Sequence, residues 1–190
     1  NDSSDNEING TEEGGITYVE GLKGQAASFD GIDDYINLGT DPSLNITGDL
    51  TVSAWLNGSS SGAIVSKMKG ASGTWVDDAY IVTLNSSGIV NFEVRNSTSP
   101  NPPSSTSNSG VLDDNWHHVV GVYDQSESKV YLYVNGVLND TQDAPDSILS
   151  EPNLITTIGA SYAVNSPFYE APFEGEIDEV EGWHDIRHHI

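Results

Sequence analysis

The chain alternates apolar and polar residues over many short segments, as expected for β-strands that are buried on one face. In "LTVSAWLNG", Val52, Ala54 and Leu56 share one face. Ser53 and Trp55 share the other. Similar runs recur along the chain: "QAASFD", "AIVSKM", "AYIVTLN", "IVNFEVRN", "HHVVGVYD", "KVYLYVNGVL", "LITTIGAS" and "GEIDEVEGW". Turn signals separate them: Asn57-Gly58, Lys69-Gly70, Ser87-Gly88, Asn135-Gly136 and Gly159. Many short strands at regular spacing predict an all-β sandwich or barrel.

The chain shows no convincing helical period, and the best candidate, Asp41 to Leu44, is a single turn. We expect residues 25–190 to form one β-domain, because one core can support a chain of this size. Residues 1–24 are polar, acidic and glycine-rich, and we interpret them as an extended arm. Such an arm is loosely tied in a monomer, and in an assembly it can add to the sheet edge of another subunit. The polar, proline-containing stretch from Asn96 to Gly110 is expected to be an exposed loop.

Charge narrows the possible partners. The 190 residues include 29 Asp and Glu against 6 Lys and Arg, which gives a formal net charge of -23. Nucleic acids and anionic membranes require a basic surface, so this balance argues against both as partners. It favours cation binding, and salt should screen the self-repulsion of the chain. The absence of cysteine excludes thiol chemistry and zinc-thiolate sites, and no apolar run approaches the ~20 residues of a membrane span.

Seven Asn-x-Ser/Thr triplets indicate an extracellular glycoprotein. They begin at Asn1, Asn9, Asn45, Asn57, Asn85, Asn96 and Asn139. Chance would give about three, and most of the seven fall in segments that we interpret as turns, where a glycan can be accommodated. The alternative is that a composition rich in Ser and Asn produces these triplets without any glycan.

The order of several motifs resembles the laminin-G-like group of the concanavalin A-like sandwiches, and within it the pentraxin-like "laminin G 3" modules. The motifs are "ASFDGIDDYINLG", "LTVSAWLN", "NWHHVVGVYD", "VYLYVNGVL", "IGA" and "FEGEIDEVEGW". The resemblance covers Gly24 to about Trp183. It implies an antiparallel jelly roll of two stacked β-sheets. It also implies a non-catalytic extracellular module for adhesion or carbohydrate binding, often with one calcium ion.

Four acids are candidate calcium ligands: Asp30, Asp33, Asp34 and Asp178. The first three lie within one turn, "DGIDD", and calcium prefers six to eight oxygen ligands. In the family that the chain resembles, the first and last strands lie side by side, which would bring Asp178 near Asp30. We therefore expect one structural calcium ion, with Asp30 and Asp178 as the strongest candidates. The alternative is that these acids make turn hydrogen bonds and keep the surface soluble.

The E-x-D-x-x-E spacing of Glu176, Asp178 and Glu181 suggests a second interpretation, a laminarinase-like glycoside hydrolase. In a strand, Glu176 and Asp178 share a face, and Glu181 joins them only across a bulge. The array ends the domain, whereas the related glucanases carry theirs mid-chain. The family motif also explains the same residues without catalysis, with Ile177 and Val180 pointing inward. We therefore expect no enzyme activity.

Aromatic and histidine side chains offer weaker candidates. Loop aromatics that could stack on sugar rings are Trp75, Tyr80, Tyr162, Phe168 and Tyr169. We expect Trp55, Phe92 and Tyr131 to lie in the core. His184, His188 and His189 have a spacing that could bind a transition metal, but we interpret this end of the chain as a frayed terminus.

The sequence thus predicts a non-catalytic extracellular surface module that recognises a glycan or a cell-surface protein. A competing hypothesis is a self-assembling subunit of a surface filament or layer, whose copies are joined through the arm at residues 1–24.

Overall fold

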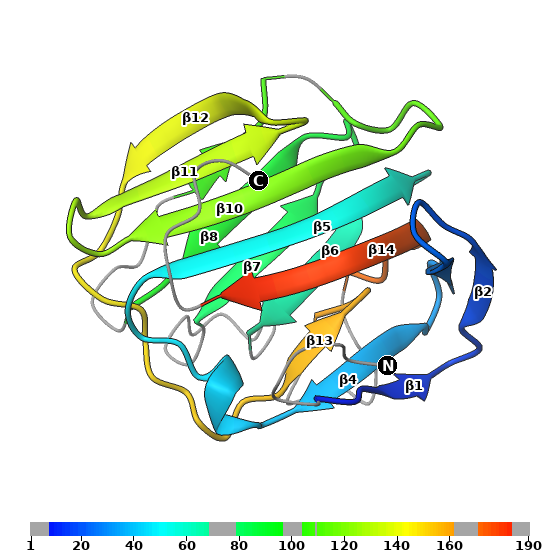
Figure 1. The fold of residues 1–190 in the computed structure, drawn as a ribbon, viewed down its shortest axis with the longest axis horizontal. Helices are drawn as coiled ribbons and strands as arrows, with labels where there is room; N and C mark the ends of the chain where they lie inside the picture. The colour runs from blue at the N-terminus through cyan, green and yellow to red at the C-terminus, as the bar shows by residue number, and fades with distance from the viewer. Residues whose placement is uncertain (1–7, 69–78, 97–103, 109, 162–170, 184–190) are drawn as a thin grey trace.

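The computed structural model describes residues 8–68, 79–96, 104–108, 110–161 and 171–183. They form two antiparallel sheets of seven strands each, stacked as a sandwich (Figure 1). Sheet A has the order β1 (Thr11–Glu13), β4 (Tyr35–Gly39), β13 (Thr156–Ile158), β6 (Gly62–Lys67), β7 (Tyr80–Leu84), β8 (Val90–Val94) and β9 (Ser104–Thr106). Sheet B has the order β12 (Val137–Asp143), β11 (Lys129–Val134), β10 (His117–Asp124), β5 (Leu50–Gly58), β14 (Glu174–Trp183), β3 (Gln25–Asp30) and β2 (Thr17–Glu20).

The predicted two-sheet antiparallel sandwich is confirmed. The described residues contain one short 3-10 helix, Pro42–Leu44, where the sequence predicts a single turn. No helix among them is long and apolar enough to cross a membrane.

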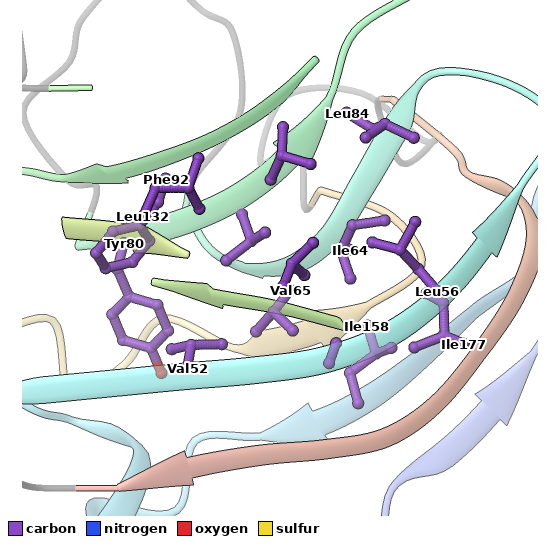
Figure 2. Packing of buried hydrophobic residues seen from close by; sticks show 14 of the residues in the cluster. Val52, Leu56, Ile64, Val65, Tyr80, Leu84, Phe92, Leu132, Ile158 and Ile177 are labelled. Atoms are coloured by element: carbon purple, nitrogen blue, oxygen red, sulfur yellow. The ribbon is translucent and has the colours of Figure 1, made fainter. Parts of the chain in front are cut away.

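The core lies between the two sheets and follows the predicted alternation (Figure 2). Leu50, Val52, Ala54 and Leu56 of β5 are almost fully buried. Phe92 of β8 is 0% exposed, so its predicted place in the core is confirmed. Each sheet therefore turns a mainly apolar face towards the other.

Strand β14 contains a bulge. Its register with β5 shifts between Asp178 and Glu181, and Glu179 has a φ of 45° in the left-handed region. Ile177 points into the core, as predicted, and Val180 packs against the core from a partly buried position. The extra residue puts Glu181 opposite the outward-facing Ser53, so Glu181 shares the outer face with Glu176 and Asp178 across the bulge, as expected from the sequence.

Residues 8–24 contribute one edge strand to each sheet of their own domain. Strand β1 pairs with β4 in sheet A, and β2 pairs with β3 in sheet B. All seven side chains of β1 and β2 are exposed. The boundary at residue 24 stays a prediction, but this part of the expected arm is paired through its backbone instead of hanging free.

Candidate functional site

The outer face of sheet B carries an open patch at one end of strands β5 and β14. Residues opposite each other in antiparallel strands share a face. Asn57 of β5 lies opposite Glu176 of β14, and Glu176 lies opposite Ser28 of β3. Trp55 is two residues before Asn57 and therefore projects to the same side. We call Trp55, Asn57, Glu176 and Ser28 the Trp55 patch; all four are partly exposed.

Trp55 is held in place by a ring contact with His118, its partner on β10. The two ring centroids are 4.9 Å apart and the planes meet at 26°, which is a stacked arrangement. Burial lowers the pKa of His118, so its imidazole is neutral at pH 7 and packs as an aromatic ring. The prediction that Trp55 belongs to the core is wrong, because the side chain projects from the outer face.

The side chains at the centre of the same outer face are buried. Thr51, Ser53, Val120 and Val122 alternate with core residues and therefore project outward, yet each is at most 3% exposed. The open end around Trp55 is thus distinct from the buried centre. A ligand that approaches this sheet can reach the Trp55 patch.

The acidic turn between β3 and β4 brings three predicted metal ligands together. Asp30, Asp33 and Asp34 each offer a carboxylate oxygen, and these oxygens lie within 4.8 Å of one another. Asp34 is 2% exposed and accepts hydrogen bonds from the backbone N–H groups of Gly15 and Asp30. Asp30 accepts one from the N–H of Ile32. Because carboxylate oxygens keep further lone pairs, the turn fits one hard cation that prefers oxygen ligands.

Asp178 does not join this turn, which corrects the expected pairing with Asp30. The register places Glu174, not Asp178, opposite Asp30. Asp178 lies four residues further along β14, which corresponds to about 13 Å. Strands β3 and β14 do lie side by side, as the resemblance implies, but the register separates these two carboxylates.

Asp178 instead binds the backbone of the β2–β3 turn. Its Oδ2 accepts hydrogen bonds from the N–H groups of Leu22 and Lys23 at 2.8 and 3.2 Å, and its Oδ1 accepts one from Glu179. The carboxylate is 6% exposed. A side chain at Gly21 would collide with it, which explains the glycine at that position.

The array of the alternative, catalytic interpretation does not form an open carboxylate pair. Asp178 is occupied by three backbone donors. Glu181 lies opposite Ser53 and Glu176 opposite Asn57, so these two acids are four residues apart along β5, about 13 Å. Glu176 remains as a partly exposed carboxylate on the Trp55 patch. The two open carboxylates that glycoside hydrolysis needs are therefore not brought together by this strand.

Two aromatic side chains lie in a different setting from the one predicted. Tyr80 was expected in a loop that binds ligand, but it lies in β7, is 3% exposed and donates its hydroxyl hydrogen to the carbonyl of Leu44. Burial raises the pKa of Tyr80 to about 12. Tyr131 was expected in the core, but it is partly exposed and donates to Glu127. Seven other candidates lie outside the described residues: Trp75, Tyr162, Phe168, Tyr169, His184, His188 and His189.

The predicted glycosylation positions differ in setting. Asn85 lies exposed in the β7–β8 turn, where its Oδ1 accepts hydrogen bonds from the N–H groups of Ser87 and Ile89. Asn57 and Asn139 lie within strands β5 and β12 and not in turns. Asn9, Asn45 and Asn96 lie outside the strands, and Asn1 lies outside the described residues.

The fold is a two-sheet antiparallel β-sandwich. A family model described as the concanavalin A-like lectin/glucanases superfamily, of the laminin G 3 type, matches residues 30–188. The chain therefore belongs to this family. No curated protein matches it.

Solved structures with the same fold include carbohydrate-binding domains. The CBM40 of the Ruminococcus gnavus IT-sialidase, bound to α2,3-sialyllactose, has a TM-score of 0.71 and 16% identity over 85% of this chain and 91% of that one. Domain 4 of AbnA, a GH43 extracellular arabinanase from Geobacillus stearothermophilus, in complex with arabinotriose, has a TM-score of 0.64 and 20% identity over 90% and 75%. Domains LG4-5 of the mouse laminin α1 chain have a TM-score of 0.64 and 17% identity over 83% and 40%. At such identities the likeness shows the fold.

Proposed function

We propose that this domain is a non-catalytic carbohydrate-binding module of extracellular proteins, and that its glycan binds to the Trp55 patch. The observation that carries the proposal is the outward-facing Trp55 ring, held by His118 and flanked by Asn57 and Glu176. The apolar face of a sugar ring can pack on such a ring, which presents a large rigid surface. The carboxamide and carboxylate beside it can bond to hydroxyl groups and fix the orientation of the sugar.

Two further observations support a binding role. The structures that share the fold include domains bound to sialyllactose and arabinotriose. Asp178, the acid that a hydrolase would need beside Glu176, is buried and bonded to three backbone N–H groups. The catalytic alternative predicts turnover of a β-glucan that disappears in Glu176→Gln, and such activity would contradict this proposal.

A glycan array followed by calorimetry tests the binding role. We expect Trp55→Ala to weaken the best ligand at least about tenfold, because truncating a central aromatic residue at a contact removes much of its binding energy. Trp55→Phe should retain part of the affinity. Tyr18→Ala, which removes another exposed aromatic ring from sheet B, serves as the matched control. Equal affinity in Trp55→Ala and the wild type, with unchanged folding, would exclude the patch.

We also propose that the acidic turn holds one calcium ion through Asp30, Asp33 and Asp34. The convergence of three carboxylate oxygens supports this assignment. Removing the ion with a chelator should lower the melting temperature, and added calcium should restore it. The double variant Asp30→Asn/Asp33→Asn should melt at the same temperature with and without the chelator. An unchanged melting temperature in the chelated wild type would remove calcium from the proposal.

A specific observation favours a second candidate function, a subunit that assembles with copies of itself. The large exposed apolar side chains of the described residues gather at or beside the two edges of sheet B: Tyr18, Val19, Leu22 and Ile32 near β2, and Val137 and Leu138 on β12. Exposed apolar side chains on an unpaired edge strand favour association. Particle size by light scattering tests this candidate. Assembly that grows with salt and is lost in Val19→Asp would support it, and a monomer at all salt concentrations would exclude it.

Glycosylation completes the proposed extracellular role. The sequence carries seven acceptor triplets, and Asn85 is the acceptor whose side chain lies exposed in a tight turn. Peptide mass spectrometry of the protein from its natural source should find glycan at Asn85, and an unmodified Asn85 would contradict this assignment.

A further inference from the structure

We propose that the Trp55 patch selects its glycan by charge, so that affinity falls from amino-bearing sugars to uncharged sugars to acidic sugars. This inference rests on the proposed function and assigns the chemical class of ligand. It concerns a specificity that neither the fold nor the family fixes, since the same sandwich is seen bound to the acidic α2,3-sialyllactose in one relative and to the neutral arabinotriose in another.

The first argument is the row of acids that borders the patch. Glu174, Glu176 and Asp178 occupy alternate positions of β14 and therefore share the outer face of sheet B. Alternate residues of a strand are about 6.7 Å apart, so Glu176 has one acid at that distance on either side along the strand. Asp30 lies directly opposite Glu174, but a calcium ion bound at the acidic turn would offset its charge, so the negative field comes from the acids of β14. A sugar that packs on Trp55 and bonds to Glu176 thus enters a strongly negative field.

The second argument concerns the basic residues of the described part of the chain, each of which already has a partner. Among the described residues, Lys23 pairs with Glu179 at 3.2 Å, Arg95 with Glu93 at 2.9 Å, and Lys129 with Asp143. Lys67 is 1% exposed and donates to the carbonyl of Leu154. Lys69 and Arg187 lie outside the described residues.

Lys23 is the described cation that the hydrogen bonds tie closest to the patch. Its backbone N–H binds Asp178, which lies opposite Trp55. Its ammonium group lies against Glu179, so this one cation offsets one neighbouring acid and leaves the row of β14 negative. A carboxylate on the ligand would compete with Glu179 for this partner.

Elementary electrostatics gives the size of the effect. Several acids at about 7 to 10 Å each add a small repulsion in a solvated site, and salt weakens it further. Together they should disfavour an acidic sugar about tenfold at physiological salt, and an amino sugar should gain by a smaller factor. The differences should shrink at high salt, whereas the affinity for an uncharged sugar should hardly change.

Matched pairs of glycans on the full chain test this ranking. Lactose is compared with α2,3-sialyllactose, and N-acetylated chitotriose is compared with its deacetylated form, each at low and high salt. We expect the uncharged member to bind more tightly in the first pair and the amino-bearing member in the second. Glu176→Gln should narrow both differences. Glu13→Gln makes the same change of charge on an exposed residue of β1, at the edge of the other sheet, and should leave both differences as they are.

The outcomes separate this inference from the proposed function. If Trp55→Ala abolishes binding but sialyllactose binds as tightly as lactose, the patch binds glycans and the selection by charge is wrong. If that acidic affinity is lost in Lys23→Gln, the ligand carboxylate pairs with the Lys23 ammonium group, which also overturns the ranking. If no glycan of the array and none of the four test glycans binds at either salt concentration, both the inference and the proposed function fail.

Discussion

The acids around strands β3 and β14 fall into two groups with opposite roles. Asp34 and Asp178 are at most 6% exposed, and each accepts at least two backbone N–H hydrogen bonds. Glu176 and Asp33 are not buried, and no backbone N–H of the described residues is bonded to either. In a chain with 29 acids, the residue type says little about the role of a carboxylate. Its access to backbone donors decides whether it holds the fold or remains available to a ligand.

The two buried acids hold the same part of the chain. Asp34 binds the N–H of Gly15, and Asp178 binds those of Leu22 and Lys23. Both contacts fasten residues 8–24, whose strands bury none of their side chains. Since apolar burial contributes little there, these hydrogen bonds should be a large part of what keeps the segment on the sandwich. The comparison therefore predicts a large loss of stability when a buried acid is replaced and a small loss when an exposed acid is replaced.

The largest effect is expected for Asp178→Ala. It leaves three backbone N–H groups without their acceptor, two of them at the β2–β3 turn. The free energy of unfolding should fall by about 3 kcal/mol, because hydrogen bonds to charged groups are stronger than neutral ones. Urea denaturation measures it. Glu181→Ala removes a nearby exposed acid and should cost little; an equal loss in both variants would mean that burial does not distinguish the two groups.

Asp34→Ala should lower the free energy of unfolding by about 2 kcal/mol. The loss is smaller than for Asp178→Ala, because the chain keeps its other contacts to the β3–β4 turn. The loss should be accompanied by faster proteolytic cleavage between residues 8 and 24, because Gly15 loses its acceptor. Asp33→Ala changes a neighbouring exposed acid and is the control, with both variants measured in the presence of a chelator so that loss of the proposed calcium ion does not contribute. If cleavage of the two variants were equally slow, the Asp34 contact would not be what fastens the segment.

Lys67 of β6, in sheet A, is a buried basic residue and can be compared with the two buried acids. Lys67 is 1% exposed, and burial lowers its pKa to about 8. Below that pH both states of the chain carry the proton, and the folded state bears the cost of a buried charge. Between about 8 and the ordinary value of 10.5 the unfolded state binds more protons, so stability should rise with pH through this window.

Lys67→Met should therefore stabilise the protein at pH 7 by about 1 to 2 kcal/mol, a value reduced by the lost hydrogen bond to Leu154. The gain should vanish as the pH approaches 10, where the wild-type side chain becomes neutral. Thermal unfolding of both proteins at several pH values measures the difference. A constant difference across this range would show that the charge of Lys67 is not the cause.

The smallest effect on stability is expected for Glu176→Gln. This acid is partly exposed and faces the Trp55 patch, so its neutralisation should change the free energy of unfolding by less than about 0.5 kcal/mol. The same variant is expected to alter the preference among glycans. A large loss of stability would place Glu176 with the buried acids and weaken its assignment to the ligand.

Local patterns in the sequence predicted most of the strands of the fold. Alternation in segments such as "LTVSAWLNG" located the strands, and it already placed Trp55 on the face opposite Val52 and Leu56. The expectation that Trp55 is buried followed its residue type instead of this pattern. Strand β9 was missed, because Ser104 to Thr106 lie in a polar stretch that was expected to be an exposed loop. Ser105 is nevertheless fully buried, with its hydroxyl donating to the carbonyl of Val130.

The site was less predictable because it depends on register. The role of Asp178 is set by hydrogen bonds to residues 155 and 156 positions away in sequence. A shift of the strand by a few residues would have placed the same acid near Asp30. No local pattern fixes that register, and the position of the bulge is shown by the register shift between β14 and β5 and by the positive φ of Glu179.

The path of residues 8–24 also has a mechanical consequence. The segment runs from the edge of sheet A to the edge of sheet B, so tension applied at the N-terminal side loads β1 first, then β2, and the sandwich last (Figure 1). Peeling an edge strand breaks its hydrogen bonds one after another, and little apolar surface resists it here. The freed segment would lengthen the chain by about 50 Å while the rest of the domain stays folded. Residues 8–24 would thus act as an extensible tether, visible as an early low-force step in single-molecule pulling.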